Sequence, residues 1–493
     1  MRRGRVVLLS LGALALTLSV PTASLQALPL DVHLALSASS PGVGDELEAA
    51  PDAVRLFFTE PVEIGLSAIE LSGPAGAVAL GPLEIADSPG SLQSVIRGGL
   101  VAGSYTVRWR AVGRDGHPVR GEFSFTLIEG AQGLETVDSV GVDTIPARTP
   151  GVPPADPSVG SDRATAEQPG SVFSSESPLY AAVRWFGYLA ILGIVGAIGF
   201  AGLFLSPRLA NGAVSAGFRR AATAGAAGLG IVAAAGLLVT LPLRLQAQSH
   251  AIFGTGIAAD RFARILESQW GLGWAFQFGG CLMALGGLLL ARRGSRAGWV
   301  LAVAGAIGVA LGPGLGGHAA AVRSISALAV LSDALHLLAA GLWLGTLLAV
   351  LTVGLPISRT LRAPERARTV FELVHAYSPL ALVAATIVVV TGGFAAFLHL
   401  TTPSDLLLTV YGRFLLAKLS AVAVVIGAGA FNWRRIRPHL ADDSTAQRLH
   451  RSASIELAAA AAVVGITAFL VAVPPPAGSA APAVQAAAES AAP

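Results

Sequence analysis

The sequence predicts a protein of two parts: an N-terminal all-β sandwich of Greek-key type and an all-α polytopic membrane domain of about eight transmembrane helices. Three observations support this prediction. Only 13% of the 493 residues are charged, with a mean hydropathy of +0.66, whereas a soluble domain carries about 25% charged residues. Apolar and polar residues alternate with a period of two before residue 130, as in half-buried strands. Long apolar stretches fill the chain after residue 180.

The N-terminus has the pattern of a secretory signal peptide, assigned to residues 1–27. A basic segment from Arg2 to Arg5 precedes an apolar run from Val6 to Val20, which is short for a membrane-spanning helix. Small residues that suit cleavage follow this run. A retained membrane anchor is the alternative, and both interpretations place the next domain on the outer side of the membrane.

Residues 28–130 form the predicted extracytoplasmic β-sandwich. In its clearest strands, 104–111 and 122–127, aromatic and aliphatic residues alternate with polar ones. Three shorter β-like runs begin at His33, Val54 and Leu66. Clusters of Pro, Gly and Asp separate the runs. About 100 residues of short strands is the size of a small sandwich domain.

The rest of the chain divides into two polar segments and a membrane domain. Residues 131–178 are predicted to be a disordered linker and residues 474–493 a disordered extracytoplasmic tail, because Gly, Pro, Ser and Ala dominate there. The membrane domain is assigned to residues 179–473. Its eight apolar stretches are long enough to cross a bilayer. They are 180–205, 221–243, 271–291, 297–314, 327–353, 377–400, 411–431 and 455–473.

The loops between these stretches differ in positive charge. With residue 179 outside, the inner loops carry 15 Lys and Arg residues, and the outer loops with the tail carry 4. Positive residues concentrate on the cytoplasmic side of membrane proteins. The distribution therefore predicts eight spans with both ends outside, in a multi-pass protein of the bacterial inner membrane.

Composition excludes several classes of partner and site. The net charge of +3 comes without a basic tract outside the membrane flanks, so no nucleic-acid partner is expected. No nucleotide-binding loop of Walker type occurs, so no nucleotide is expected either. Cys281 is the single cysteine, which excludes an intrachain disulfide and a paired-cysteine metal site. A bound metal must therefore use imidazole, carboxylate or backbone groups.

A carboxylate and an imidazole lie close together in the sequence between the two clearest strands. Asp115 and His117 are two residues apart in a tight Asp-Gly-His-Pro turn, so both side chains can point to one spot. An exposed polar turn without a ligand is the alternative interpretation of this pattern.

Several ordered motifs resemble known families. Ser39-Ser-Pro, Phe57-Phe-Thr-Glu-Pro-Val62 and Asp115-Gly-His-Pro-Val-Arg-Gly121 resemble the CopC family of secreted copper-binding β-sandwiches. The membrane part resembles the CopD family, which is often fused behind CopC. The matching stretches are Gly314-Leu-Gly-Gly-His-Ala319, Asp333-Ala-Leu-His-Leu-Leu, Gly341-Leu-Trp-Leu-Gly345, Gly412-Arg-Phe-Leu-Leu-Ala-Lys-Leu419, Asn432-Trp-Arg-Arg435 and Glu456.

The CopC resemblance implies a Cu(II) site made by His33, Asp115 and His117. In the family the first histidine is usually the mature N-terminus, and its α-amine also binds copper. This chain departs from that pattern, because its cleavage signals lie upstream of His33. The methionine-rich Cu(I) site of some relatives is not expected, because residues 28–130 contain no methionine.

Ionisable residues inside the predicted spans are candidate functional groups. At about 1.5 Å per residue, Asp333 lies roughly 9 Å and His336 roughly 13 Å from the outer end of the fifth span, and Lys418 lies roughly 10 Å deep in the seventh. An Asp333–Lys418 ion pair that only joins two helices is the alternative. His318 and His399 are placed at the outer side, where they can complete a membrane entry site with His336.

Two functions compete. In the first, the protein is not an enzyme but imports copper. The β-sandwich captures copper, with an external copper chaperone as a candidate donor. It then passes the copper to a histidine-lined entry in the lipid-embedded domain. The second is a membrane oxidoreductase, dependent on b-type haem or on copper, that reduces Cu(II), because paired histidines on neighbouring helices can ligate haem.

Overall fold

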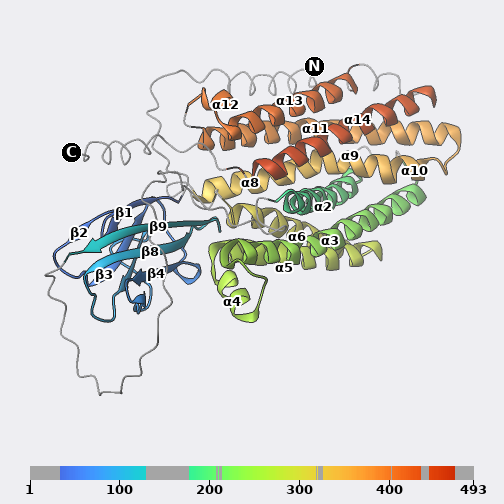
Figure 1. Cartoon of the computed structure of the whole chain (residues 1–493). Coiled ribbons are helices and arrows are strands. Elements are labelled where there is room, and N and C mark those ends of the chain that lie inside the picture. The colour runs from blue at the N-terminus through green and yellow to red at the C-terminus, as the bar shows by residue number, and fades with distance from the viewer. Residues whose placement is uncertain are drawn as a thin grey trace, which may run out of the picture.

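The computed structural model describes residues 34–128, 177–206, 214–317, 326–400, 402–432 and 443–471, with a few single positions between them. A β-domain lies against one end of a bundle of long helices (Figure 1). We call this end of the bundle the docking end and the opposite end the far end. The segments predicted as signal peptide and tail, and residues 131–176 of the predicted linker, lie outside the described residues. Pro178, the last residue of the predicted linker, is the first residue of the helix Pro178–Leu203.

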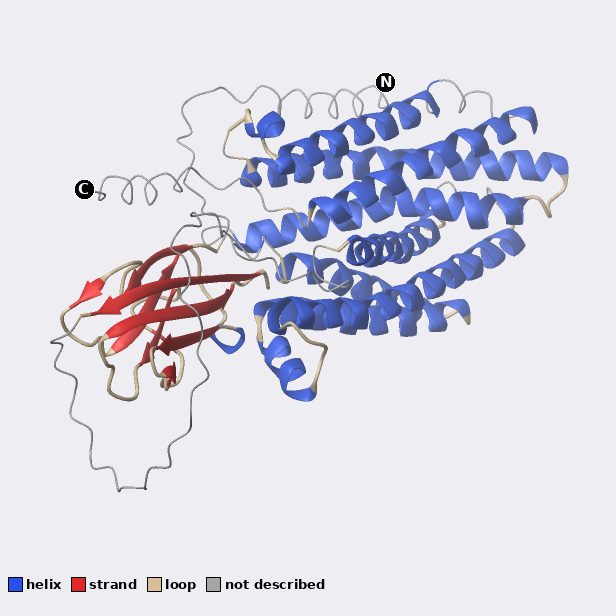
Figure 2. Cartoon of the chain, viewed as in Figure 1, coloured by secondary structure: helices blue, strands red, loops and turns tan. Residues whose placement is uncertain are grey.

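The β-domain is a sandwich of two sheets (Figure 2), as predicted. The sheets have the strand orders β1-β3-β7-β6 and β2-β9-β8-β4-β5. All pairs are antiparallel except β2 with β9. The strands are β1 Leu36–Ser40, β2 Glu46–Leu47, β3 Ala53–Phe58, β4 Ala68–Gly73, β5 Gly76–Val78, β6 Glu84–Ile85, β7 Ser91–Val95, β8 Gly103–Val112 and β9 Pro118–Leu127.

The period-two alternation predicted for β8 and β9 is confirmed. Tyr105 and Trp109 of β8 are buried between the sheets together with Phe125 of β9. The rings of Tyr105 and Phe125 stack with their centroids 5.4 Å apart, and Phe58 of β3 meets Trp109 edge to face at 5.4 Å. Aromatic pairs of this geometry add to the stabilisation from burial alone.

The strand predicted from Leu66 begins later in the chain. Residues Ile64–Leu66 form a short 3-10 turn, η1, and β4 starts at Ala68. Leu66 is buried because it packs against Ile265 and Trp270 of the helical domain, and not between the two sheets. The first strand likewise starts at Leu36 and not at the predicted His33.

Eight helices of the described residues are long and apolar enough to cross a membrane, as predicted. The fifth, Ser326–Ser358, is interrupted by two π-helical turns. Its parts are α8 Ser326–Ala340, η3 Gly341–Gly345, α9 Thr346–Ala349, η4 Val350–Gly354 and α10 Leu355–Ser358. The other long helices are α2 Pro178–Leu203, α3 Ala216–Phe253, α5 Gln269–Arg292, α6 Arg296–Leu315, α11 Ala363–His399, α13 Val410–Phe431 and α14 Asp443–Leu470. Two short helices are α4 Ala259–Glu267 and α12 Asp405–Leu408.

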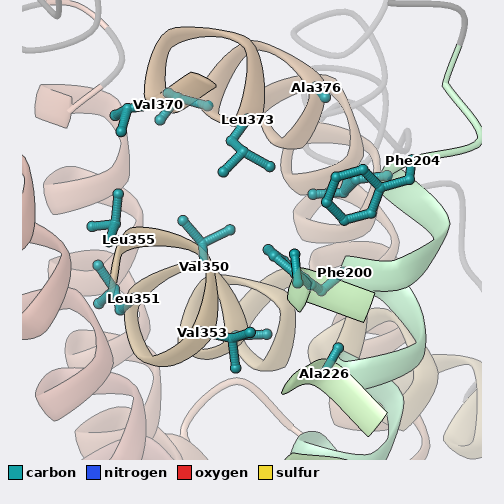
Figure 3. Packing of buried hydrophobic residues seen from close by; sticks show 14 of the residues in the cluster. Phe200, Phe204, Ala226, Val350, Leu351, Val353, Leu355, Val370, Leu373 and Ala376 are labelled. Carbon is teal, nitrogen blue, oxygen red and sulfur yellow. The ribbon is translucent and has the colours of Figure 1, made fainter. Parts of the chain in front are cut away.

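A cluster of buried apolar side chains joins the helices in the far half of the bundle. Figure 3 shows Phe200 of α2 beside Val350 and Val353 of η4, with Leu373 of α11 above Val350. Phe204, which directly follows α2, belongs to the same cluster. Each of these five side chains is at most 8% exposed. Helices distant in the sequence therefore form one packed unit.

The fifth span crosses α2 at glycines. A Cβ atom on Gly345 would lie 2.0 Å from the carbonyl oxygen of Leu192, and one on Gly196 would lie 2.0 Å from the carbonyl carbon of Gly345. Small residues at such crossings let two membrane helices approach closely.

Replacing Gly345 with alanine is therefore expected to destabilise the membrane domain by about 1–3 kcal/mol, the usual cost of overpacking. The measurement is the thermal unfolding midpoint of the purified full chain in detergent. Gly202→Ala is the matched control, because a Cβ there meets nothing within 4 Å. Equal unfolding midpoints for the two variants would contradict this account of the crossing.

Candidate metal centre

The turn between β8 and β9 holds Asp115 and His117 in contact. Oδ2 of Asp115 lies 3.0 Å from Nδ1 of His117, and Oδ1 accepts a hydrogen bond of 3.0 Å from the His117 backbone N–H. The side chain of Asp115 is 6% exposed and that of His117 is 45% exposed. A buried carboxylate therefore orients a partly exposed imidazole, an arrangement common at metal-binding histidines.

The backbone of the turn explains the Asp-Gly-His order. Gly116 has a φ of +81°, which residues with a side chain rarely adopt. Its N–H donates to the carbonyl of Gly113 at 2.9 Å, and the N–H of Gly113 donates to the carbonyl of His117 at 3.2 Å. The turn thus places the side chains of residues 115 and 117 on one side of the hairpin end.

The beginning of the described chain lies beside this turn. A Cβ atom on Gly113 would lie 2.9 Å from Oδ1 of Asp115 and 3.8 Å from Cβ of Leu34. Leu34 is 7% exposed and belongs to the core of the β-domain. His33, the third predicted ligand, lies outside the described residues and directly precedes Leu34.

The same turn docks on the helical bundle. Nε2 of Gln248, in α3, donates a hydrogen bond of 2.6 Å to the carbonyl of Gly116. A Cβ atom on Gly116 would lie 2.8 Å from that nitrogen and 2.8 Å from Cδ1 of Trp270 in α5. Gly116 is therefore required both by the turn and by its close approach to the two helices.

Hydrogen bonds around the turn extend this docking contact. Nη2 of Arg120 donates to the carbonyls of Ala251 and Ile252, at 2.7 and 3.0 Å. The backbone N–H of Gln269 donates to Oε1 of Glu63 at 3.0 Å. Burial lowers the pKa of the Arg120 guanidinium and raises the pKa of the Glu63 carboxyl, against the opposing effect of the Gln269 hydrogen bond.

Apolar side chains fill the centre of the contact. Leu66 and Val112 of the β-domain pack against a group of helix residues at the docking end, all buried. This group is Leu245, Ile252, Ile265 and Trp270. The guanidinium of Arg110 lies over the ring of Phe253, 5.5 Å from its centroid. The interface combines an apolar centre with a polar rim, as stable protein interfaces do.

Two glycines at the end of α6 lie between the docking surface and the interior of the bundle. A Cβ atom on Gly316 would lie 3.0 Å from the carbonyl oxygen of Trp270, and a Cβ on Gly314 would lie 3.4 Å from Cβ of Asp333. We call Gly314 and Gly316 the glycine seam. The end of α6 thus contacts both Trp270, which touches the β-domain turn, and Asp333 inside the bundle.

Lys418 lies within electrostatic range of both Asp333 and His336 inside the bundle. Lys418 of α13 interacts electrostatically with Asp333 and His336 of α8. Among the described residues, Asp333 and Lys418 do not form a salt bridge. Nδ1 of His336 lies 2.9 Å from Oγ1 of Thr391, and a Cβ on Gly392 would lie 3.3 Å from its Cε1. His336 is therefore held against α11.

Sequence reasoning missed a second polar group at similar depth. Arg244 of α3 donates to Oε1 of Gln277 in α5, and Arg184 of α2 donates to the carbonyl of Ala468 at 3.3 Å. Tyr188 interacts electrostatically with both arginines and with Asp333. A signal for this group was present in the sequence, because Arg184 lies within an apolar stretch.

The structure does not describe the side chains of the other two predicted membrane ligands. His318 lies outside the described residues, and His399 is the last residue of α11 with its side chain outside them. In the described part of the chain, no three His, Cys, Asp or Glu side chains gather as a group that could hold a metal ion. The structure thus joins Asp115 with His117, and Asp333 with His336 and Lys418.

Two protein families match parts of this chain. The family described as CopC domain matches residues 36–128, and the family described as Copper resistance protein D matches residues 371–470. The first match covers the β-domain and the second covers α11 to α14.

Individual proteins match longer and shorter parts. Copper transport protein CutJ of Bacillus subtilis (strain 168) is 27% identical over 408 residues, which cover 81% of this chain and 68% of CutJ. Copper resistance protein C of Escherichia coli is 34% identical over 103 residues, which cover 19% of this chain and 81% of that protein. The crystal structure of PcoC, a methionine-rich copper resistance protein from Escherichia coli, is 33% identical, with a TM-score of 0.18, and the match covers 19% of this chain and 98% of PcoC.

These matches occur in one chain and in the order β-domain, then membrane helices. They support a role in copper transport or copper resistance for a multi-pass membrane protein. The chain belongs to the CopC family through its β-domain and is a fusion of that CopC domain with a CopD membrane domain.

Proposed function

We propose that this protein imports copper: the β-domain captures Cu(II) outside the bacterial inner membrane and passes copper to a polar entry in the membrane domain. The observation that carries the proposal is the docking of the Asp115–His117 turn on α3 and α5. Gly116 lies between the two candidate ligands and itself accepts the hydrogen bond from Gln248. Copper bound at this turn is held directly at the docking end of the bundle.

The proposed Cu(II) ligands are His33, Asp115 and His117. Imidazole nitrogen and carboxylate oxygen are donors that suit Cu(II). The packing of Leu34 beside Gly113 supports a position for His33 near the other two ligands. The signal peptide proposed for residues 1–27 delivers this domain to the extracytoplasmic side, where an external copper chaperone is a candidate donor.

The proposed route into the membrane domain follows the glycine seam. Asp333 lies next to Gly314 and compensates the charge of an entering cation, which is otherwise costly to bury. His336 is the next ligand, with His318 and His399 as further ligands at the same end. Lys418 interacts electrostatically with Asp333 and balances its charge when copper is absent.

Charge balance supports this route over one between α2 and α3. Arg184 and Arg244, on α2 and α3, donate to neutral groups, and their positive charge repels a cation. At the glycine seam, the Asp333 carboxylate offsets the charge of Lys418. Copper is therefore expected to enter between α6 and α8.

Copper accumulation in membrane vesicles tests the proposal. Right-side-out vesicles with the wild-type chain are expected to accumulate copper, and His336→Ala and Asp333→Asn are expected to abolish this accumulation without loss of protein from the membrane. His450→Ala, an exposed position of α14, is the control and is expected to behave as wild type. Full accumulation by a folded His336→Ala variant would remove His336 from the route, and accumulation only in inverted vesicles would reverse the direction.

The haem-based alternative requires two axial imidazoles. Its candidates are His336, which is hydrogen-bonded to Thr391, and His399, whose side chain lies outside the described residues. No observation in the described part of the chain favours this function. An absorption spectrum of the purified full chain tests it, because a Soret band would show bound haem.

A further inference from the structure

A second buried carboxylate lies in the far half of the bundle. Glu456 of α14 is 4% exposed, and its Oε2 accepts a hydrogen bond of 3.1 Å from Nδ2 of Asn432, at the end of α13. The indole of Trp343 lies within hydrogen-bonding range of the same carboxylate. Trp343 belongs to the π-helical turn η3, and such turns inside α-helices are frequent at functional sites.

The contacts described for Glu456 are with neutral groups. Tyr377 of α11 interacts electrostatically with the carboxylate, and its hydroxyl donates to the carbonyl of Trp343 at 3.0 Å. Glu456 forms no salt bridge with another described residue. The basic residues near Asn432 and Glu456 whose side chains the structure describes, Arg434, His450 and Arg451, are exposed. A charged carboxylate is costly to bury without a cation, and a bound proton removes that cost.

Asn432 can serve both protonation states of this carboxylate. In the structure its amide nitrogen donates to Glu456, while its Oδ1 is buried without a hydrogen-bond partner. A half-turn of the amide presents Oδ1 as the acceptor that a protonated carboxyl needs. Gly429 leaves room for this exchange, because a Cβ atom there would lie only 3.3 Å from Oε1 of Glu456.

We propose that Glu456 is a proton-binding site of the membrane domain, with Asn432 as its switching partner. One O–H bond forms when the carboxylate takes a proton from water at the far end, and the same bond breaks when the proton returns to water. We further infer that this exchange accompanies the movement of copper, a step that rests on the proposed function. Trp343, which contacts Glu456, follows Asp333 by ten residues along the fifth span, about 15 Å at 1.5 Å per residue, so copper and proton would bind at different places.

Infrared difference spectroscopy of the purified full chain between acidic and alkaline pH tests proton binding without any need for transport. Wild type is expected to show a carboxylic C=O band that appears on acidification and is lost in Glu456→Gln. The glutamine variant keeps the size and the acceptor oxygen of the side chain, so the hydrogen bonds to Asn432 and Trp343 can remain. Glu365→Gln, an exposed position near the far end, is the control and should keep the band. A band unchanged in Glu456→Gln would overturn the proposal.

Copper accumulation by proteoliposomes at a series of pH values tests the coupling. Wild type and Glu365→Gln are expected to show the same pH dependence, whereas Glu456→Gln is expected to lose it. A Glu456→Gln variant with wild-type pH dependence would overturn the coupling and leave the proposed import intact. Absence of copper accumulation in wild type would instead contradict the proposed function and the coupling with it, while the infrared band would still decide whether Glu456 binds a proton.

Discussion

Replacing His117 with alanine is expected to weaken Cu(II) binding by the β-domain by more than about 100-fold. Loss of a residue that merely orients a metal ligand costs about 10–100-fold in affinity, so loss of a ligand should cost more. In the structure Asp115 fixes the orientation of the His117 imidazole through the 3.0 Å contact with Nδ1. The Asp115→Asn change is therefore expected to have the smaller effect of the two.

Competition with a chelator of known affinity measures this effect on a fragment that begins at residue 28 and ends at residue 130. Such a fragment is expected to fold, because copper resistance protein C, which matches over 81% of its own length, is a separate protein. Asp87→Asn, an exposed carboxylate elsewhere in the domain, serves as the control. Tight Cu(II) binding by His117→Ala would exclude the Asp115–His117 turn as the metal centre.

A second fragment that begins at His33 isolates the contribution of the α-amine. In this fragment the α-amine of His33 is free and can act as an additional nitrogen ligand. The shorter fragment should then bind Cu(II) more tightly than the longer one. N-terminal sequencing of the mature protein then decides which fragment corresponds to the natural chain. Equal affinities would show that the amine takes no part.

Truncating Trp270 to alanine is expected to separate the two domains and to stop copper accumulation while Cu(II) binding persists. Trp270 is 8% exposed and fills the centre of the docking contact, and removal of a buried tryptophan side chain costs about 3–5 kcal/mol. Gln248→Ala removes the hydrogen bond to Gly116 as well. The double variant should therefore lose docking most completely.

Cross-linking of Arg120→Cys to Ala251→Cys with a short bismaleimide measures docking, because the spacer takes the place of the long Arg120 side chain, whose end contacts the carbonyl of Ala251. The yield of this cross-link should fall when Trp270 is truncated. Phe276→Ala is the matched control, an aromatic residue of the same helix that is 45% exposed and lies outside the contact. If the undocked variant still accumulates copper at the wild-type rate, transfer across this interface is wrong.

The two-part architecture, the strands β8 and β9 and the number of spans were predictable from local sequence patterns. Alternation in a strand and hydropathy in a helix are local properties, and both can be counted along the chain. The pairing of Asp115 with His117 was also predictable, because two residues across one turn remain close in any hairpin. His33, His318 and His399 stay predictions, since the structure does not describe the side chains of these residues.

Contacts between distant parts of the chain became visible only in the tertiary structure. Leu66 has the pattern of a strand residue, but its burial comes from Ile265 and Trp270. Gln248 and Gly116 are separated by 132 residues and yet share a hydrogen bond. No local pattern marks such contacts, because they depend on which surfaces of two folded domains are complementary.

The same physical reason applies to the polar groups inside the bundle. Lys418 and Asp333 were recognisable as ionisable residues within apolar stretches, but their arrangement with His336 depends on how α8, α11 and α13 pack. The sequence marks Asn432 and Glu456 only as motif residues, and their hydrogen bond arises because α13 and α14 pack together. Sequence shows which residues are costly to bury, and only the packing of the helices shows which partner offsets that cost.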